Sequence, residues 1–183
     1  MPLRRAVLAV LPLLLLLVAA PADAGRAEPQ SQSQSQPQSQ SQSRLGIPRT
    51  YDAALAHFDH ATETRALKKF YTPSGNIYCN VGLKGYPRGC EINQGQVHDP
   101  AACAGNHESK DVGRLELRRN RVVPVCNTDT IQTRPTKVLP YGQATTARGV
   151  SCISEEIGVT CISLKRTLGF FLHRGEYVIF SAG

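Results

Sequence analysis

Six cysteines constrain the fold of this chain more than any other feature of its sequence. All of them lie beyond residue 78, at Cys79, Cys90, Cys103, Cys126, Cys152 and Cys161. Six cysteines allow many pairings, but Cys79–Cys90 and Cys152–Cys161 each flank a turn-rich loop typical of a β-hairpin. Cys103 and Cys126 then remain for a third bond. In an exported protein we expect three disulfides, each contributing about 2–4 kcal/mol to stability.

The N-terminal segment 1–24 has the three parts of a secretory signal peptide. Arg4 and Arg5 supply a basic start, residues 6–20 are apolar, and Ala22-Asp23-Ala24 matches a cleavage site. The apolar run is shorter than the roughly 20 residues that span a bilayer. We therefore expect a secreted, extracytoplasmic mature chain without a transmembrane segment.

Two segments separate the signal peptide from the first cysteine. Residues 25–49 contain SQSQSQPQSQSQS, which has no apolar residue to bury and predicts a disordered linker. Residues 50–69 predict an amphipathic helix, capped by Thr50 and unable to continue past Pro73. Its expected apolar face is Tyr51, Leu55, Phe58, Thr62 and Ala66.

Residues 70–183 predict β structure, because short apolar runs such as NIYCNV, VVPVC and EYVIF recur between turn residues. In GRLELRR, the leucines Leu115 and Leu117 alternate with charged residues, which predicts a half-buried strand with its charged face exposed. The two short cystine hairpins also resemble each other, as a weak internal repeat would. The expected fold is mostly β: a small disulfide-stapled sandwich or barrel of cystine hairpins with one N-terminal helix.

The C-terminal stretch GFFLHRGEYVIF holds a large part of the aromatic content of the chain. We expect its aromatic residues to form the core seam of a terminal hairpin that turns near Arg174-Gly175. These residues are Phe170, Phe171, Tyr177 and Phe180.

A resemblance to a known family extends over about residues 70–180. It rests on TPSGNIYC with GCEI, DVGRLELRRNRVVPVCNTDT, VLPYGQ, GVSCISEEIGVTCIS and GFFLHRGEYVIF, in this order and spacing. These motifs resemble a family of small secreted domains, found mainly in actinobacteria and catalogued as a domain of unknown function. Thr72 stands where the family pattern has serine, and His173-Arg174 replaces Ser-Arg. The resemblance implies a secreted, disulfide-bonded β domain, and it implies no catalytic residues.

Candidate catalytic and metal-binding residues are few. Ser74, in TPSGNIYC, follows Pro73 and precedes Gly75, a composition typical of a turn rather than of a nucleophile elbow. His107 and Glu108 are the only candidates for acid–base catalysis, although neighbours on a strand would point to opposite faces.

Two groups of residues could hold a metal. His57 and His60 are three positions apart on the expected helix, but no third ligand is evident, so we interpret them as exposed. His98, Cys103 and His107 form a looser group, in which an exported cysteine favours a disulfide over zinc. We expect no metal and no cofactor.

Positive charge is the most suggestive surface property. The chain has 21 Lys and Arg against 14 Asp and Glu, a formal net charge of +7. Candidate binding residues cluster around an expected hairpin tip at Arg119-Asn120, where guanidinium groups suit phosphate or carboxylate ligands. They are Arg114, Arg118, Arg119 and Arg121. Tyr86 and Tyr141 lie in loops that the sequence does not place beside these arginines, so nucleic acid is not an expected partner.

These observations favour a monomeric, non-enzymatic binding module for an anionic cell-envelope polymer or an extracellular protein. One alternative is a small secreted hydrolase, a ribonuclease-like phosphodiesterase that uses His107 and Glu108. A second alternative is a protein inhibitor or effector that presents the loop 83–89.

Overall fold

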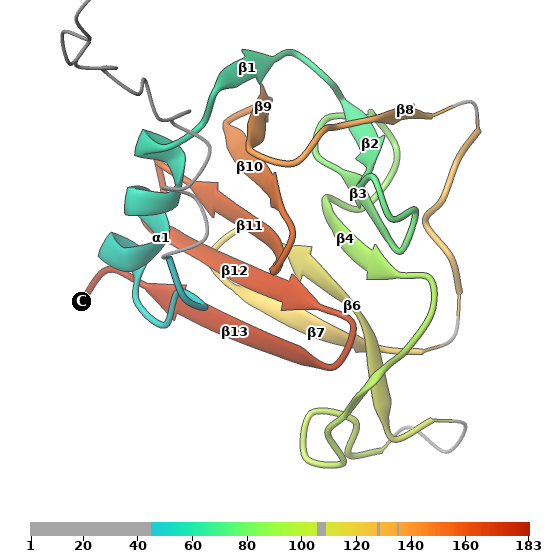
Figure 1. Cartoon of the computed structure of the whole chain (residues 1–183). Helices are drawn as coiled ribbons and strands as arrows, with labels where there is room; N and C mark the ends of the chain where they lie inside the picture. The colour runs from blue at the N-terminus through green and yellow to red at the C-terminus, as the bar shows by residue number, and fades with distance from the viewer. Residues whose placement is uncertain (1–44, 106–108, 128, 135) are drawn as a thin grey trace, which may run out of the picture. The chain divides into compact units, whose positions relative to one another are not determined.

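The computed structural model describes residues 45–105, 109–127, 129–134 and 136–183 (Figure 1). The predicted signal peptide and most of the predicted linker lie outside these ranges. Within them the chain forms one helix, α1 (Tyr51–Asp59), and thirteen strands in two sheets. The prediction of a mostly β fold is confirmed.

The first sheet has six strands. Its adjacent strands pair antiparallel, except β1 and β9, which pair in parallel. In spatial order the strands are β1 (Glu63–Arg65), β9 (Gln143–Ala147), β10 (Val150–Glu155), β11 (Gly158–Ser163), β12 (Leu168–His173) and β13 (Glu176–Ser181). From β9 to β13 each strand follows its neighbour in the sequence, so short turns connect them.

The second sheet has seven strands and is antiparallel except for β2 and β8. Its spatial order is β5 (Val97–His98), β6 (Asp111–Leu117), β4 (Gly89–Ile92), β3 (Ile77–Asn80), β2 (Lys69–Tyr71) and β8 (Lys137–Val138), with β7 (Val122–Cys126) paired to β6. The two sheets stack face to face and bury a shared apolar core, to which both contribute.

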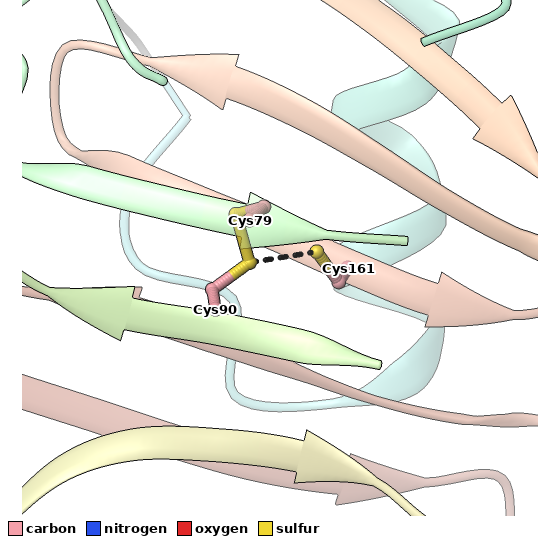
Figure 2. Close-up of side chains that lie close together, drawn as sticks. All are labelled: Cys79, Cys90 and Cys161. Atoms are coloured by element: carbon pink, nitrogen blue, oxygen red, sulfur yellow. Dashed lines mark hydrogen bonds between the residues drawn. A yellow bond between two sulfur atoms is a disulfide. The ribbon is translucent and has the colours of Figure 1, made fainter. Parts of the chain in front are cut away.

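The three disulfides join the cysteines in the predicted pairs, Cys79–Cys90, Cys103–Cys126 and Cys152–Cys161. The first and third bonds each link directly paired residues of neighbouring strands, β3 with β4 and β10 with β11. The two cystine hairpins belong to different sheets, and both bonds lie in the core between these sheets. There Cys90 and Cys161 face each other (Figure 2).

The helix α1 packs on the outer face of the first sheet, so that this sheet is covered on both sides (Figure 1). Thr50 caps its start, because the Thr50 hydroxyl accepts a hydrogen bond from the backbone N–H of Ala53 at 3.1 Å. Tyr51 and Ala54 are buried against the sheet, with Leu55 partly buried beside them.

The helix is shorter than the predicted range 50–69, because it ends at Asp59. Residues 63–65 form β1 instead, which pairs in parallel with β9. The β-branched Thr62 and Thr64 favour an extended chain, and the backbone N–H of Thr62 donates to the carbonyl of Gly142 at 2.8 Å. Pairing with a distant strand therefore takes the place of the C-terminal part of the expected helix.

The packing of the first sheet also changes the interpretation of the C-terminal aromatics. Phe170 faces the core between the sheets, whereas Phe171 and Phe180 face α1. The hairpin formed by β12 and β13 thus carries two apolar faces, where the sequence predicted a single seam. Alternation along a strand buried on both sides accounts for this arrangement.

The outer face of the second sheet is covered by a stretch of chain from Asp129 to Thr133. Arg114 is buried, with 9% of its surface exposed, and its Nε donates to Glu116 Oε1 at 3.0 Å. Its Nη1 donates to the carbonyl of Asp129 at 2.7 Å. The charged face of β6 is therefore enclosed, and the expectation of an exposed charged face is wrong.

The folded part begins before residue 50. Pro48 is buried, Ile47 packs against the apolar cluster beneath α1, and Arg49 forms a salt bridge of 3.0 Å with Glu176. Residues 45–49, which the sequence assigned to the linker, thus belong to the domain. Apolar contacts with β-strands that follow much later in the chain hold them there.

Candidate anion-binding site

Basic side chains gather at one end of the two sheets, in four connections between strands. These are residues 81–88 between β3 and β4, 118–121 between β6 and β7, 148–149 between β9 and β10, and 164–167 between β11 and β12. We call this group of connections the basic pole. Its cationic residues are Lys84, Arg88, Arg118, Arg119, Arg121, Arg148, Lys165 and Arg166.

Hydrogen bonds tie the four connections into one surface. The backbone N–H of Leu117 donates to the carbonyl of Arg88 at 2.7 Å, within the second sheet. Arg88 Nη1 donates to the carbonyl of Arg148 at 3.4 Å, and Arg166 Nη1 donates to the carbonyl of Arg118 at 3.5 Å. The last two contacts cross from one sheet to the other, so arginines from both sheets share the basic pole.

A pocket of about 360 Å³ opens in the basic pole. It is lined by Leu83, Lys84, Gly85, Tyr86, Arg88, Arg148 and Arg166. Four of these residues are cationic and none is a carboxylate, while Tyr86 is 49% exposed and offers an aromatic wall. The volume is within the range of pockets that hold small ligands or groups of a larger one.

The positive charge of this pocket is not neutralised by the described part of the protein. Among those residues, no carboxylate forms a salt bridge with Arg88, Arg148 or Arg166. Burial lowers the pKa of Arg88, and the nearby charges of Arg166 and Arg148 lower this pKa further. The three guanidinium groups therefore repel one another, and a bound anion would relieve that repulsion.

The backbone of the basic pole is unusual at Arg148. Arg148 (φ 51°) and Gly149 (φ 78°) form the two-residue turn between β9 and β10, which has positive φ at both positions. Such turns favour Asn-Gly, and a residue other than glycine costs about 1–3 kcal/mol in this conformation. The strain makes Arg148 a candidate functional residue.

The four predicted binding arginines divide into two groups. Arg114 is enclosed beneath residues 129–133 and does not belong to the exposed surface. Arg118, Arg119 and Arg121 lie exposed at the turn between β6 and β7, as predicted, at the rim of the basic pole. Arg118 is partly neutralised by a salt bridge of 3.1 Å to Glu116.

Two of the histidine candidates pair with carboxylates from other elements. His57 is 2% exposed, not exposed as predicted, and its Nδ1 lies 2.8 and 2.9 Å from the two carboxylate oxygens of Glu155. His98 Nδ1 lies 2.8 Å from Asp111 Oδ1, and Cys103 is held in a disulfide. His60 is the residue that follows the end of α1. The candidates His107 and Glu108 lie outside the described residues.

Ser74 belongs to a turn between β2 and β3, in agreement with the sequence. Its Oγ accepts from the backbone N–H of Asn76 at 3.3 Å, and Gly75 has a φ of 69°. The opening TPSGN motif is thus a turn that leads into the strand of Cys79. Ser74 also lines a second pocket, at the opposite end of β3 from the basic pole.

The sequence did not single out Arg88, Arg148 and Arg166, which carry the site. Each is the single arginine of its connection, so no local cluster of arginines marks it. The available signal was topological: in a meander of hairpins, alternate turns lie at the same end of a sheet. The turns after β9 and β11 share an end for this reason, and stacking of the sheets adds the loop after β3.

Among the described residues, no helix is long and apolar enough to cross a membrane. Comparison of the chain with protein-family models, with curated proteins and with solved structures gives no match. The family resemblance of the sequence motifs therefore stays a prediction.

Proposed function

We propose that this protein is an extracytoplasmic, non-enzymatic binding module whose basic pole binds an anionic polymer of the cell envelope. The observation that carries the proposal is the pocket lined by Arg88, Arg148 and Arg166, in which none of the described lining residues is a carboxylate. Repeated phosphate or carboxylate groups on a polymer would engage the pocket and the exposed arginines of the β6–β7 turn together.

Binding is favoured over catalysis because the pocket offers no acid–base group near neutral pH. Among the residues that the structure describes, its lining contains no histidine, aspartate or glutamate. The hydrolase alternative depends on His107 and Glu108, outside the described residues, and no observation favours it. Three disulfides support the extracytoplasmic location, since such bonds persist in oxidising compartments.

The test is binding of the purified, oxidised protein to poly(glycerol phosphate), measured by calorimetry at several salt concentrations. The test variant is Arg148→Gln with Arg166→Gln. The matched control is Arg65→Gln with Arg134→Gln, which removes the same charge from exposed residues outside the basic pole. The slope of log K against log salt concentration falls in magnitude by about one for each phosphate contact that is lost. We therefore expect this slope to fall in magnitude by about two in the test variant and to stay unchanged in the control.

Equal losses in both variants would show that net charge alone attracts the polymer, and the proposed site would be rejected. Absence of binding at low salt would reject the function itself.

A further inference from the structure

A second pocket lies at the opposite end of the same strands. β3, β10, β11 and β12 each have one end at the basic pole and the other end at this pocket, whose volume is about 370 Å³. We call it the turn pocket, because turns and loops supply most of its lining. Its walls come from the turns after β2, β10 and β12, and from the loops after β4 and β8. Nothing in the proposed anion binding uses this pocket.

The carboxylate of Glu155 forms part of the pocket lining and is fixed by the buried His57. Both oxygens of Glu155 lie within 2.9 Å of His57 Nδ1, and His57 comes from α1, beneath the sheet. The Glu155 side chain is 12% exposed. An acceptor fixed in this way loses little conformational freedom when a ligand donates a hydrogen bond to it.

A second part of the lining presents polar groups that are also fixed by hydrogen bonds. Ser74 Oγ lies 3.1 Å from Thr72 Oγ1, and Asn76 Oδ1 accepts from the backbone N–H of Gln94 at 2.7 Å. In the described part of the chain, the Nδ2 donors of Asn76 have no hydrogen-bond partner. The pocket thus offers both fixed acceptors and unused donors.

The charges and surfaces of the turn pocket select a class of ligand. The carboxylates of Glu155 and Glu156 disfavour an anionic ligand. The guanidinium of Arg174 disfavours a cationic ligand, and so does His57, which already occupies the Glu155 carboxylate. The mixture of hydroxyl, amide and carboxylate groups disfavours a purely apolar molecule. Tyr141, 36% exposed, adds one flat apolar surface.

We propose that the turn pocket binds a neutral saccharide. A sugar ring matches the pocket in three ways: its hydroxyls both donate and accept, it carries no charge, and its C–H face can pack on an aromatic ring. Tyr141 is the packing surface, Glu155 accepts from sugar hydroxyls, and Asn76 donates to them. The proposal rests on these residues alone and does not depend on anion binding at the basic pole.

The test is saturation-transfer NMR of the oxidised protein with neutral sugars, followed by titration. The probes are glucose, galactose, mannose and N-acetylglucosamine, each as a monosaccharide and as a disaccharide. We expect at least one to bind with a Kd in roughly the millimolar range. Tyr141→Ala should weaken this binding about tenfold or more, whereas the control Tyr86→Ala, at the basic pole, should leave it unchanged.

Asn76→Ala and Glu156→Gln serve as further variants, because both side chains line the pocket and neither lies in the apolar core. Circular dichroism confirms that each variant is folded. The proposal is overturned if none of the sugars receives saturation from the folded protein. It is also overturned if binding persists unchanged in folded Tyr141→Ala and Asn76→Ala, since the sugar would then lie elsewhere.

Discussion

The Sγ atom of Cys90 lies 3.6 Å from the Sγ atom of Cys161 (Figure 2). The disulfides Cys79–Cys90 and Cys152–Cys161, one in each sheet, therefore touch inside the core. All four cysteines involved are fully buried. Each bond joins the strands of one hairpin, and their contact packs the two hairpins against each other. The weak sequence similarity between the cystine hairpins thus corresponds to equivalent positions, one in each sheet.

This contact predicts that the two disulfides are energetically coupled. Replacement of Cys79 and Cys90 by alanine, or of Cys152 and Cys161, should each lower the free energy of unfolding by about 3 kcal/mol. Removal of both bonds should deviate from the sum by about 0.5–3 kcal/mol, because the two sites share packing. Urea unfolding of the single, double and parent proteins measures the deviation. Additive losses within about 0.5 kcal/mol would contradict the coupling.

A second prediction concerns the strained turn of the basic pole. Arg148→Asn places the residue that the turn favours before Gly149, so the free energy of unfolding should rise by about 1 kcal/mol. The same change removes a guanidinium from the pocket and should weaken binding to poly(glycerol phosphate). Thermal unfolding and calorimetry measure the two effects. If binding is kept while stability rises, the arginine has no role in recognition.

Local patterns in the sequence predicted the features that depend on neighbouring residues. The cystine hairpins followed from glycine-rich loops between cysteines, and the start of α1 followed from Thr50 as a capping residue. Ser74 in a turn followed from its proline and glycine neighbours. In each case the decisive interaction spans few residues, such as the bond from Ala53 N–H to the Thr50 hydroxyl.

Long-range contacts decided the features that the sequence could not predict. Arg114 is enclosed because residues 129–133 cross over β6, and no pattern around Arg114 indicates that cover. His57 is buried because Glu155, 98 positions later, meets it beneath α1. The helix ends early because β1 finds its partner in β9. The basic pole likewise assembles from turns that are far apart in the chain.

The hydrogen bond between Tyr177 and Asp99 predicts a loss of stability at high pH. Tyr177 Oη donates to Asp99 Oδ2 at 2.5 Å, and burial together with this carboxylate raises the pKa of Tyr177 from 10.0 to about 12. The folded state therefore favours the neutral phenol. The stability that the neutral Tyr177 phenol contributes is fully present below pH 10 and is lost as the pH rises through about 12.

Tyr177→Phe should remove this alkaline loss, so its stability should change less between pH 10 and 12 than that of the parent protein. Denaturant unfolding at a series of pH values measures the difference, with Tyr86→Phe as a control on an exposed tyrosine. The hydrogen bond from Tyr177 lowers the pKa of Asp99, so the same contact should also weaken as the pH falls below 3.8. An unchanged alkaline profile in Tyr177→Phe would contradict the assignment.

A close approach of strands predicts that Gly89 tolerates no side chain. A Cβ atom at this position would lie 2.0 Å from the backbone oxygen of Leu115, on the neighbouring strand β6. Backbone cannot move aside as a flexible side chain could, so Gly89→Ala should cost about 3 kcal/mol or more. Gly85→Ala tests only the effect of a positive φ, because open space surrounds that residue, and it should cost less. Equal unfolding midpoints for the two variants would show that β4 and β6 can separate.

The pair formed by His57 and Glu155 predicts that α1 is anchored by a polar contact as well as by its apolar face. His57→Ala leaves a largely buried carboxylate without its partner, so the free energy of unfolding should fall by about 3 kcal/mol. In a double-mutant cycle with Glu155→Ala, the coupling energy should be about 1–3 kcal/mol, because each single change already removes the contact. Hydrogen exchange locates the effect: amides of α1 should lose protection in His57→Ala, while those of β3 and β4 should not. A coupling energy near zero would mean that apolar packing of Tyr51 and Ala54 alone holds the helix on the sheet.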